Sequence, residues 1–137
     1  MLTGSCLCGR VTYEVDGKLG PITYCHCDIC QKAQGGAFVV AAPARRKYFR
    51  LVTGADAITE YESSPGKYRG FCTSCGSPLW SRRTAEPETL RLRLGAVNGD
   101  PGRRPAAHIW VNDKAPWFTI TDDLPQSRTD GSDLQSA

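Results

Sequence analysis

The residues best suited to chemistry are seven cysteines, which fall into three short clusters. The clusters are a C-x-C at Cys6 and Cys8, a C-x-C-x-x-C at Cys25, Cys27 and Cys30, and a C-x-x-C at Cys72 and Cys75. A closed structural zinc site takes four protein ligands, whereas a catalytic zinc site takes three and keeps one position for water or substrate. Because seven divides into four plus three, the cysteines predict two zinc ions per chain with two different roles.

Disulfide or redox use of these cysteines is less favoured. The sequence has no basic segment followed by an apolar run at its start, and no apolar stretch near the roughly 20 residues of a membrane span, so we expect a cytoplasmic protein. In a reducing compartment, clustered cysteines are more often metal ligands or redox groups than disulfides. The odd number would leave one thiol unpaired, and a thioredoxin-like pair would need a βαβ context that this sequence lacks.

The first and last clusters can form the closed site. In an extended strand, residues i and i+2 point to the same side, so Cys6 and Cys8 can face one ion. Cys72 and Cys75 resemble a zinc-ribbon knuckle, in which Gly76 permits the tight turn of the backbone. This four-cysteine site would join segments more than 60 residues apart in the sequence. Structural zinc can contribute on the order of 10 kcal/mol to folding.

The middle cluster can form the open site. Cys25 and Cys27 share one face of a strand, and Cys30 follows as the chain turns into a short helix. Three thiolates can therefore meet at one ion and leave the fourth position for water or a substrate. A histidine could instead complete a closed site. Strand alternation turns His26 away from its neighbours, and His108 begins an apolar strand, where a hydrogen-bonded core or surface histidine is the more common case.

The rest of the chain predicts an all-β domain of many short strands. Apolar and polar residues alternate in two segments with the period of a half-buried strand. The alternating apolar residues are Val11, Tyr13 and Val15 in the first segment and Leu90, Leu92 and Leu94 in the second, where Arg91 and Arg93 lie between them. Further strands are expected at residues 37–42, 48–53, 58–62, 68–71, 79–82, 108–111 and 118–121. The one expected helix runs from about Asp28 to Gln34 and is stopped by Gly35 and Gly36.

Length and composition fit one globular domain. The chain has 137 residues, of which 40% are hydrophobic and 23% charged. We expect the domain to span residues 1–125 and the mostly polar residues 126–137 to form a mobile tail. The formal charge of +3 counts the cysteines as neutral. Seven thiolates and two Zn²⁺ would bring that charge to zero, which removes the hint of nucleic-acid binding.

The three cysteine motifs and several later segments form a familiar pattern. Its segments are residues 4–9, 25–32, 35–36, 38, 71–79, 94–97, 108–111 and 114–118, and it covers about residues 2–125. The pattern is similar to that of the glutathione-dependent formaldehyde-activating enzyme family, which also includes centromere protein V. The resemblance implies several coiled antiparallel β-sheets that hold two zinc ions. It also implies a structural zinc on Cys6, Cys8, Cys72 and Cys75, and a catalytic zinc on Cys25, Cys27 and Cys30.

The resemblance further implies a reaction. In the enzyme that gives the family its name, glutathione and formaldehyde combine to S-hydroxymethylglutathione, and the class is a carbon–sulfur lyase, named for the reverse direction. The catalytic residues implied here are Cys25, Cys27 and Cys30, with a small thiol such as glutathione as the partner.

The sequence contains no clear glutathione-binding motif. The basic residues that could meet the glutathione carboxylates are Lys32, Arg45, Arg46 and Lys47. Exposed Lys and Arg are the norm, so a solvated charged face is the favoured interpretation of these four. Trp110 and Trp117 are expected in the core or at its rim rather than against a ligand.

Two other functions remain as alternatives. One is a zinc-stabilised binding module that uses the basic runs 45–47 and 103–104. These runs are short and lack the interleaved aromatic residues of a single-strand binding surface. The other is a redox sensor, in which oxidation of the three-thiolate site releases zinc.

Overall fold

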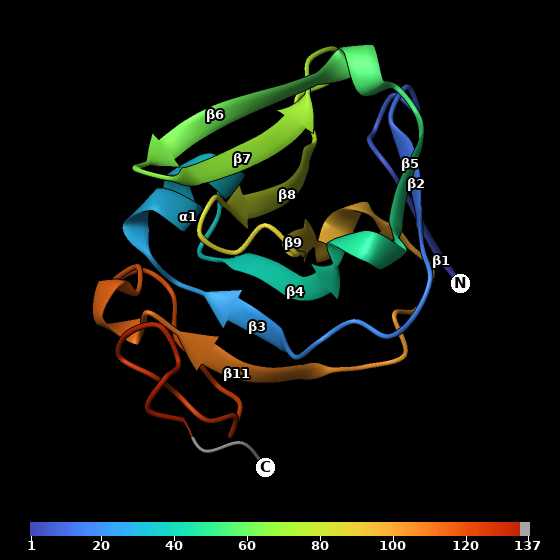
Figure 1. Cartoon of the computed structure of the whole chain (residues 1–137). Coiled ribbons are helices and arrows are strands. Elements are labelled where there is room, and N and C mark those ends of the chain that lie inside the picture. The colour runs from blue at the N-terminus through green and yellow to red at the C-terminus, as the bar shows by residue number, and fades with distance from the viewer. Residues whose placement is uncertain (135–137) are drawn as a thin grey trace.

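The computed structural model describes residues 1–134, which form two β-sheets and one α-helix (Figure 1). The smaller sheet has the order β10 (Val97–Asn98), β1 (Leu2–Ser5), β2 (Thr12–Val15) and β5 (Phe49–Thr53). The larger sheet has the order β11 (Pro105–Ile109), β3 (Ile22–Cys25), β4 (Val39–Arg45), β9 (Thr89–Arg93), β8 (Pro78–Arg83), β7 (Lys67–Cys72) and β6 (Ile58–Ser64). The helix α1 spans Asp28–Gln34, and short 3₁₀ helices span Arg46–Tyr48, Ala55–Ala57, Leu94–Ala96 and Val111–Asp113. The predicted all-β class with a single short α-helix is confirmed.

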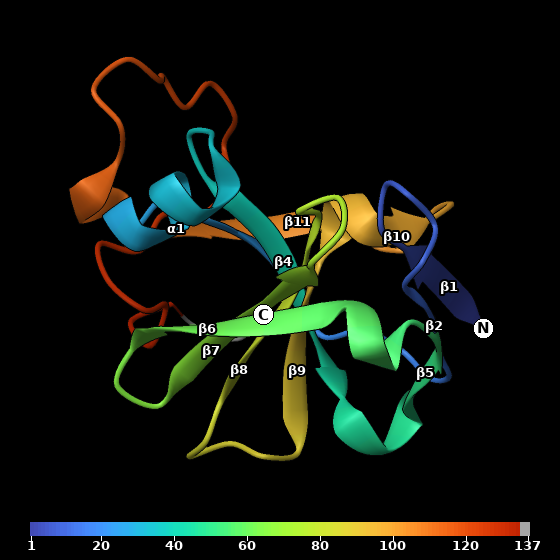
Figure 2. The same cartoon turned by 90° about the horizontal axis from the view of Figure 1, so that it is seen from above.

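The larger sheet is strongly curved. In Figure 1 it runs from β11 at the bottom through β3 and β4 to β7 and β6 at the top, and the smaller sheet stands at its right-hand side. Seen from above in Figure 2, α1 lies at the end of the molecule opposite β1 and β2. Within residues 1–134, no helix has the length and apolar character needed to cross a membrane.

Apolar residues of the two sheets meet in one core. The smaller sheet contributes Tyr13 and Val15 of β2, together with Val11, which directly precedes that strand. The larger sheet contributes Leu90 and Leu92 of β9. All five are fully buried. The predicted alternation is confirmed for Tyr13 and Val15 in β2 and for Leu90 and Leu92 in β9, and these apolar faces hold the sheets together. It fails at the end of the second segment, because Arg93 is buried and Leu94 begins a 3₁₀ helix.

Three expectations about strands were wrong. The strand expected at residues 108–111 is β11, which ends at Ile109; Trp110 then has a φ of 56° and a 3₁₀ helix begins at Val111. The pair β11–β3 is parallel, so the larger sheet is not purely antiparallel. Alternation along one segment does not specify its partner, and here the partner lies about 80 residues earlier in the chain. Residues 118–121 form no strand. The outer edge of β11 is occupied by a bridge between His108 and Gln126, and the ring of Phe118 packs on Phe38 with centroids 5.4 Å apart.

The segment after Pro125 lies along β11 as far as the structure describes it. The His108 amide donates a hydrogen bond to the Pro125 carbonyl (2.9 Å), and the Ser127 amide donates one to the His108 carbonyl (2.8 Å). Ser127 is fully buried. The polar composition of this segment could not predict these backbone hydrogen bonds. The domain limits of 1–125 and 126–137 stay predictions, and residues 135–137 lie outside the described residues.

The ring of Tyr13 fixes the contact between β1 and β2. Tyr13 lies opposite Gly4, and a Cβ added at Gly4 would come within 2.1 Å of the ring carbon Cζ. The ring also packs on Phe49, with centroids 5.1 Å apart. Within the described chain, the Tyr13 hydroxyl has no hydrogen-bond partner, and burial raises its pKa to about 12.

Replacing Tyr13 by Phe should therefore stabilise the protein. Tyr13→Phe removes a buried hydroxyl without a partner, which we expect to raise the free energy of unfolding by about 1 kcal/mol at pH 7. The unfolded tyrosine ionises near pH 10 and the folded one near pH 12, so the wild type loses stability between these values. The gain should thus be about 1 kcal/mol larger at pH 11.

Urea unfolding at pH 7 and pH 11 measures both effects. Tyr61→Phe is the matched control, because Tyr61 is exposed and its variant should behave as the wild type. Equal stability of Tyr13→Phe and the wild type at both pH values would contradict this account of the buried hydroxyl.

Candidate functional site

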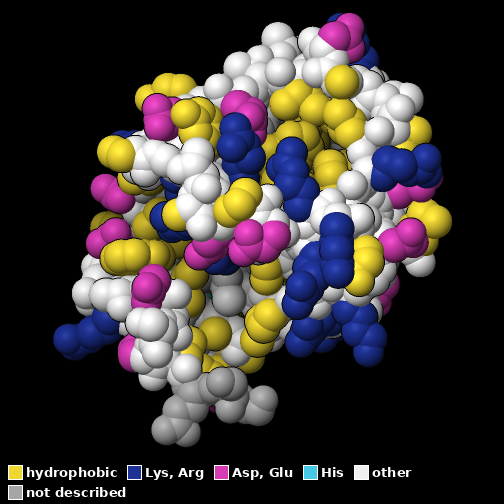
Figure 3. Space-filling view, viewed as in Figure 1, with side chains coloured by type: hydrophobic (Ala, Val, Ile, Leu, Met, Phe, Trp, Pro, Cys, Tyr) yellow, Lys and Arg dark blue, Asp and Glu magenta, His cyan; other side chains and the backbone are white. Residues whose placement is uncertain are grey.

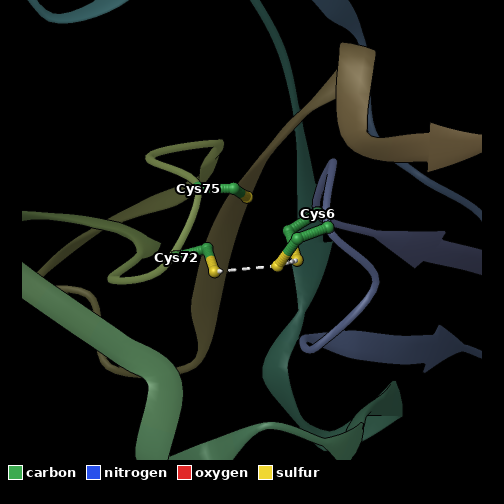
Figure 4. A group of neighbouring side chains, drawn as sticks. Cys6, Cys72 and Cys75 are labelled. Carbon is green, nitrogen blue, oxygen red and sulfur yellow. Dashed lines mark hydrogen bonds between the residues drawn. The ribbon is translucent and has the colours of Figure 1, made fainter.

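Four cysteine sulfurs converge between the two sheets. Cys6 and Cys8 lie in the loop after β1, Cys72 ends β7, and Cys75 lies in the turn to β8. Figure 4 shows Cys72 and Cys75 facing Cys6 across this gap. The Sγ atoms of Cys6 and Cys8 are 3.6 Å apart, and those of Cys8 and Cys72 are 3.8 Å apart. All four ligand atoms lie within 4.8 Å of one another.

The spacing of these sulfurs fits a metal ion. Four sulfurs at the usual Zn–S distance around a tetrahedral ion would be about 3.8 Å apart, whereas disulfide sulfurs are about 2.05 Å apart. The cysteines are all free thiols. The cluster could therefore hold a metal ion, as the sequence predicted, and such an ion would join the smaller sheet to the larger one.

The local backbone of the first C-x-C differs from the prediction. Cys6 and Cys8 lie in a turn and not in an extended strand. The Cys6 amide donates to the Val11 carbonyl (3.0 Å), and the Gly9 amide donates to the Cys6 carbonyl (3.2 Å). A tight turn brings the two sulfurs together as well as strand alternation would. The tight turn predicted after Cys75 is present. Gly76 has a φ of 76°, and its amide donates a hydrogen bond to the Cys72 carbonyl.

Hydrogen bonds favour the thiolate form of Cys75 in this cluster, whereas the pKa of Cys8 is raised to about 11. The Ser77 Oγ lies 3.3 Å from the Cys75 Sγ, and the Val11 amide donates to the Cys6 Sγ at 3.3 Å. The hydrogen bond from Ser77 lowers the pKa of Cys75 to about 5. At least one thiolate is therefore available at neutral pH, which is the form that binds metals.

Three more sulfurs meet at the start of α1. Cys25 ends β3, Cys27 caps the N-terminus of α1, and Cys30 lies in its first turn. The Cys30 amide donates to the Cys27 Sγ (3.2 Å), and the Cys30 and Cys25 sulfurs are 3.3 Å apart. The three ligand atoms lie within 4.8 Å of one another, so this cluster could also hold a metal ion. The helix begins and ends where the sequence predicted, with Gly35 as its C-cap.

Arg69 supports the three-cysteine cluster from another strand. Its Nη2 donates to the Cys30 Sγ at 3.6 Å, and its Nε donates to the Ser63 Oγ at 2.9 Å. The hydrogen bond to Cys25 and the guanidinium of Arg69 both lower the pKa of Cys30, which favours its thiolate. Sequence analysis missed Arg69, because nothing near it in the chain points to the cluster.

Neither histidine belongs to the cluster. The His26 Nε2 and the His108 Nδ1 are 2.8 Å apart, and the His108 Nε2 is 3.0 Å from a carboxylate oxygen of Asp122. Both ring nitrogens of His108 are therefore used in hydrogen bonds. Burial, with His108 and Lys114 nearby, lowers the pKa of His26 to about 4. Both histidines are buried, and no histidine side chain appears on the face in Figure 3.

His108 was expected to be a hydrogen-bonded histidine of the core or the surface, and the structure places it in the core. Within residues 1–134, no histidine or carboxylate joins Cys25, Cys27 and Cys30 in a ligand group. Among the described residues, only these three cysteine sulfurs are placed to bind a metal ion at this point.

The other candidate residues lie on the surface. The basic residues Lys32, Arg45, Arg46 and Lys47 are exposed, as the solvated-face interpretation predicted. Trp110 is half-buried, as expected for the rim of the core, but Trp117 is 70% exposed, so its expected place in the core or at its rim is wrong. In the basic run 103–104, Arg104 pairs with Asp100 (2.9 Å) and Arg103 donates to the Leu19 carbonyl. That run is therefore engaged within the molecule.

The fold and the two thiol clusters define a small β-protein with two candidate metal centres. The model of a family described as glutathione-dependent formaldehyde-activating enzyme matches residues 1–113. A Halomonas elongata protein named "Putative glutathione-dependent formaldehyde-activating enzyme" is 31% identical over 128 residues, which cover 88% of this chain and 81% of that one. A crystal structure of a Rhodobacter sphaeroides protein matches with a TM-score of 0.62 and 28% identity, over 75% of this chain and 97% of that one. The chain belongs to the glutathione-dependent formaldehyde-activating enzyme family.

Removal of His108 should affect stability and not metal content. His108→Gln breaks the hydrogen bonds to buried His26 and to Asp122, which we expect to lower the free energy of unfolding by about 1–3 kcal/mol. The metal content of the purified variant, measured by mass spectrometry, should equal that of the wild type. If His108→Gln contained one equivalent of metal per chain less than the wild type, this histidine would be a metal ligand.

Proposed function

We propose that the protein is a zinc-dependent enzyme that makes and breaks the carbon–sulfur bond of formaldehyde adducts of glutathione. The observation that carries this proposal is the convergence of three cysteine sulfurs without a fourth protein ligand among the described residues. That ligand count is typical of a catalytic zinc centre. Membership of the family supports glutathione and formaldehyde as the reactants.

The proposal gives the two cysteine clusters different roles. Cys6, Cys8, Cys72 and Cys75 would hold a structural zinc, since four thiolates complete its coordination. Cys25, Cys27 and Cys30 would hold the catalytic zinc. When bound there, zinc supplies a Lewis acid that favours the thiolate form of a substrate thiol at neutral pH. We further propose a cytoplasmic location, where both reactants and reduced cysteines are maintained.

The reaction itself is an addition. The sulfur of the glutathione thiolate attacks the carbonyl carbon of formaldehyde, and a carbon–sulfur bond forms as the π electrons move to oxygen. The oxygen then takes up a proton to give S-hydroxymethylglutathione, and the reverse steps constitute the lyase direction. In this chain, the hydrogen bonds with Cys25 and Cys27, and then the guanidinium of Arg69, lower the pKa of Cys30 and favour its thiolate. The partial exposure of Cys25 and Cys27 leaves the cluster open to a substrate.

Exchange spectroscopy tests this activity directly. In a mixture of glutathione, formaldehyde and their adduct, the protein should increase the exchange rate measured by NMR above the uncatalysed rate. Treatment with a chelator should return the rate to the uncatalysed value. An exchange rate that does not change with protein concentration would contradict the proposed function.

Serine substitutions test the division of roles. Cys27→Ser should abolish the increase in exchange rate and shift the melting temperature by only a few degrees, because Ser is also a good N-cap acceptor for the Cys30 amide. Cys72→Ser should unfold the protein, because a structural zinc contributes on the order of 10 kcal/mol. Circular dichroism and the exchange assay measure these effects. Similar losses of melting temperature in both variants would count against separate roles.

A further inference from the structure

Basic side chains share one face of the larger sheet. In an antiparallel pair, residues opposite each other lie on the same face, as do residues i and i+2 of one strand. Lys67 of β7 lies opposite Arg83 of β8. Arg69 lies opposite Ser81, which lies opposite Arg91 of β9. The residues of this face are Lys67, Arg69, Ser81, Arg83, Arg91 and Arg93. Five cations therefore surround one serine.

The same face continues to the three-cysteine cluster. Arg93 lies opposite Ala41 of β4, and Ala41 lies opposite Thr23 of β3. Cys25 comes two residues after Thr23 and shares its side of the strand. A cleft of about 80 Å³ lies on this face, and its walls include Cys25, Cys30, Lys67, Ser81, Arg83, Arg91 and Arg93. Thiol sulfurs and cations thus line one cleft.

The positive charges of this cleft outnumber its carboxylates. Within residues 1–134, every ion pair involves other basic residues, and Asp130 is the only acidic residue that lines the cleft. Three thiolates with a divalent ion would add a single negative charge, so the cations stay in excess. Like charges opposite each other destabilise a sheet. An anion bound in the cleft would relieve this repulsion.

Two polar atoms of this face are buried without partners, and a buried arginine lies beside them. Arg69 is 8% exposed, Arg93 5% and Ser81 1%. Among the described residues, the Arg69 Nη1 and the Ser81 Oγ make no hydrogen bond. Burial lowers the pKa of Arg93 to about 10. Buried polar groups are normally hydrogen-bonded, so a ligand in the cleft that accepts a hydrogen bond would satisfy the Ser81 hydroxyl, which lines it.

We propose that this cleft binds a carboxylate of the thiol substrate and so places its sulfur at Cys25 and Cys30. The proposal rests on the proposed function and specifies its substrate as a thiol that carries a carboxylate. Whole small molecules occupy pockets of about 300–1,000 Å³, so a cleft of about 80 Å³ fits an end group only. A neighbouring groove of about 710 Å³ shares Thr23, Arg91, Ile109 and Asp130 with the cleft and can receive the rest of a tripeptide.

Calorimetric titration without aldehyde tests the carboxylate subsite. The zinc-loaded protein is titrated with glutathione and with glutathione diethyl ester, which lacks both carboxylates. The wild type should bind glutathione at least about tenfold more tightly than the ester, because charge-assisted hydrogen bonds are the strong ones. Arg83→Gln and Arg91→Gln should weaken glutathione binding by about tenfold and leave ester binding unchanged. Both positions are at least partly exposed, so the variants should fold.

Lys18→Gln is the matched control, since it removes an exposed positive charge on another part of the molecule. It should bind both compounds as the wild type does. Equal affinity of the wild type for glutathione and its ester, or unchanged glutathione binding in both arginine variants, would overturn the proposal. Displacement of glutathione by inorganic phosphate at equal concentration would also overturn it, because the cleft would then be a general anion site.

The two proposals can fail separately. Selective glutathione binding without faster exchange of the adduct would refute the proposed function and leave the carboxylate subsite in place. Faster exchange with an unchanged KM for glutathione in Arg83→Gln would refute the subsite and leave the function in place.

Discussion

The convergence of four cysteine sulfurs between the two sheets is the constraint on which the rest of the structure depends. It brings the loop after β1 to the turn between β7 and β8, across 64 positions of sequence. The shared core lies beside it, and Cys6 and Cys72 are themselves part of that core. A bound ion would fix the position of the larger sheet relative to the smaller one. In the larger sheet β3, β4, β9, β8 and β7 follow one another side by side, so their residues on one face are neighbours.

The three-cysteine cluster has the opposite character. Its sulfurs come from one short segment, where Cys27 caps the helix that carries Cys30, so no distant part of the chain is needed to assemble it. What the distant strands contribute is charge. Arg69 reaches Cys30 from β7, and the neighbouring cations of β8 and β9 extend from the sulfurs along the sheet. The site thus combines a locally built group of three thiols, of which Cys30 has a lowered pKa, with positive charges that only the assembled sheet provides.

The sequence predicted what short-range spacing determines. The cysteine groups, the helix from Asp28 to Gln34 and the burial of Tyr13 and Leu92 follow from local patterns, and the structure has them. Features set by long-range register were missed. Alternation placed Arg91 and Arg93 on the polar face of a strand, yet only the pairing of β9 with β8 and β4 turns that face into a cleft. The parallel pairing of β11 was unpredictable for the same reason.

The stepwise removal of zinc by a chelator tests most directly the central claim that four cysteines serve the fold and three serve the chemistry. The account predicts two equivalents of zinc per chain. One equivalent should leave at low chelator concentration with the far-ultraviolet circular dichroism unchanged, because a zinc held by three cysteines would keep one coordination position open to a competing ligand. The second should leave only as the protein unfolds. Release of both equivalents in a single step together with unfolding would contradict the division of the seven cysteines.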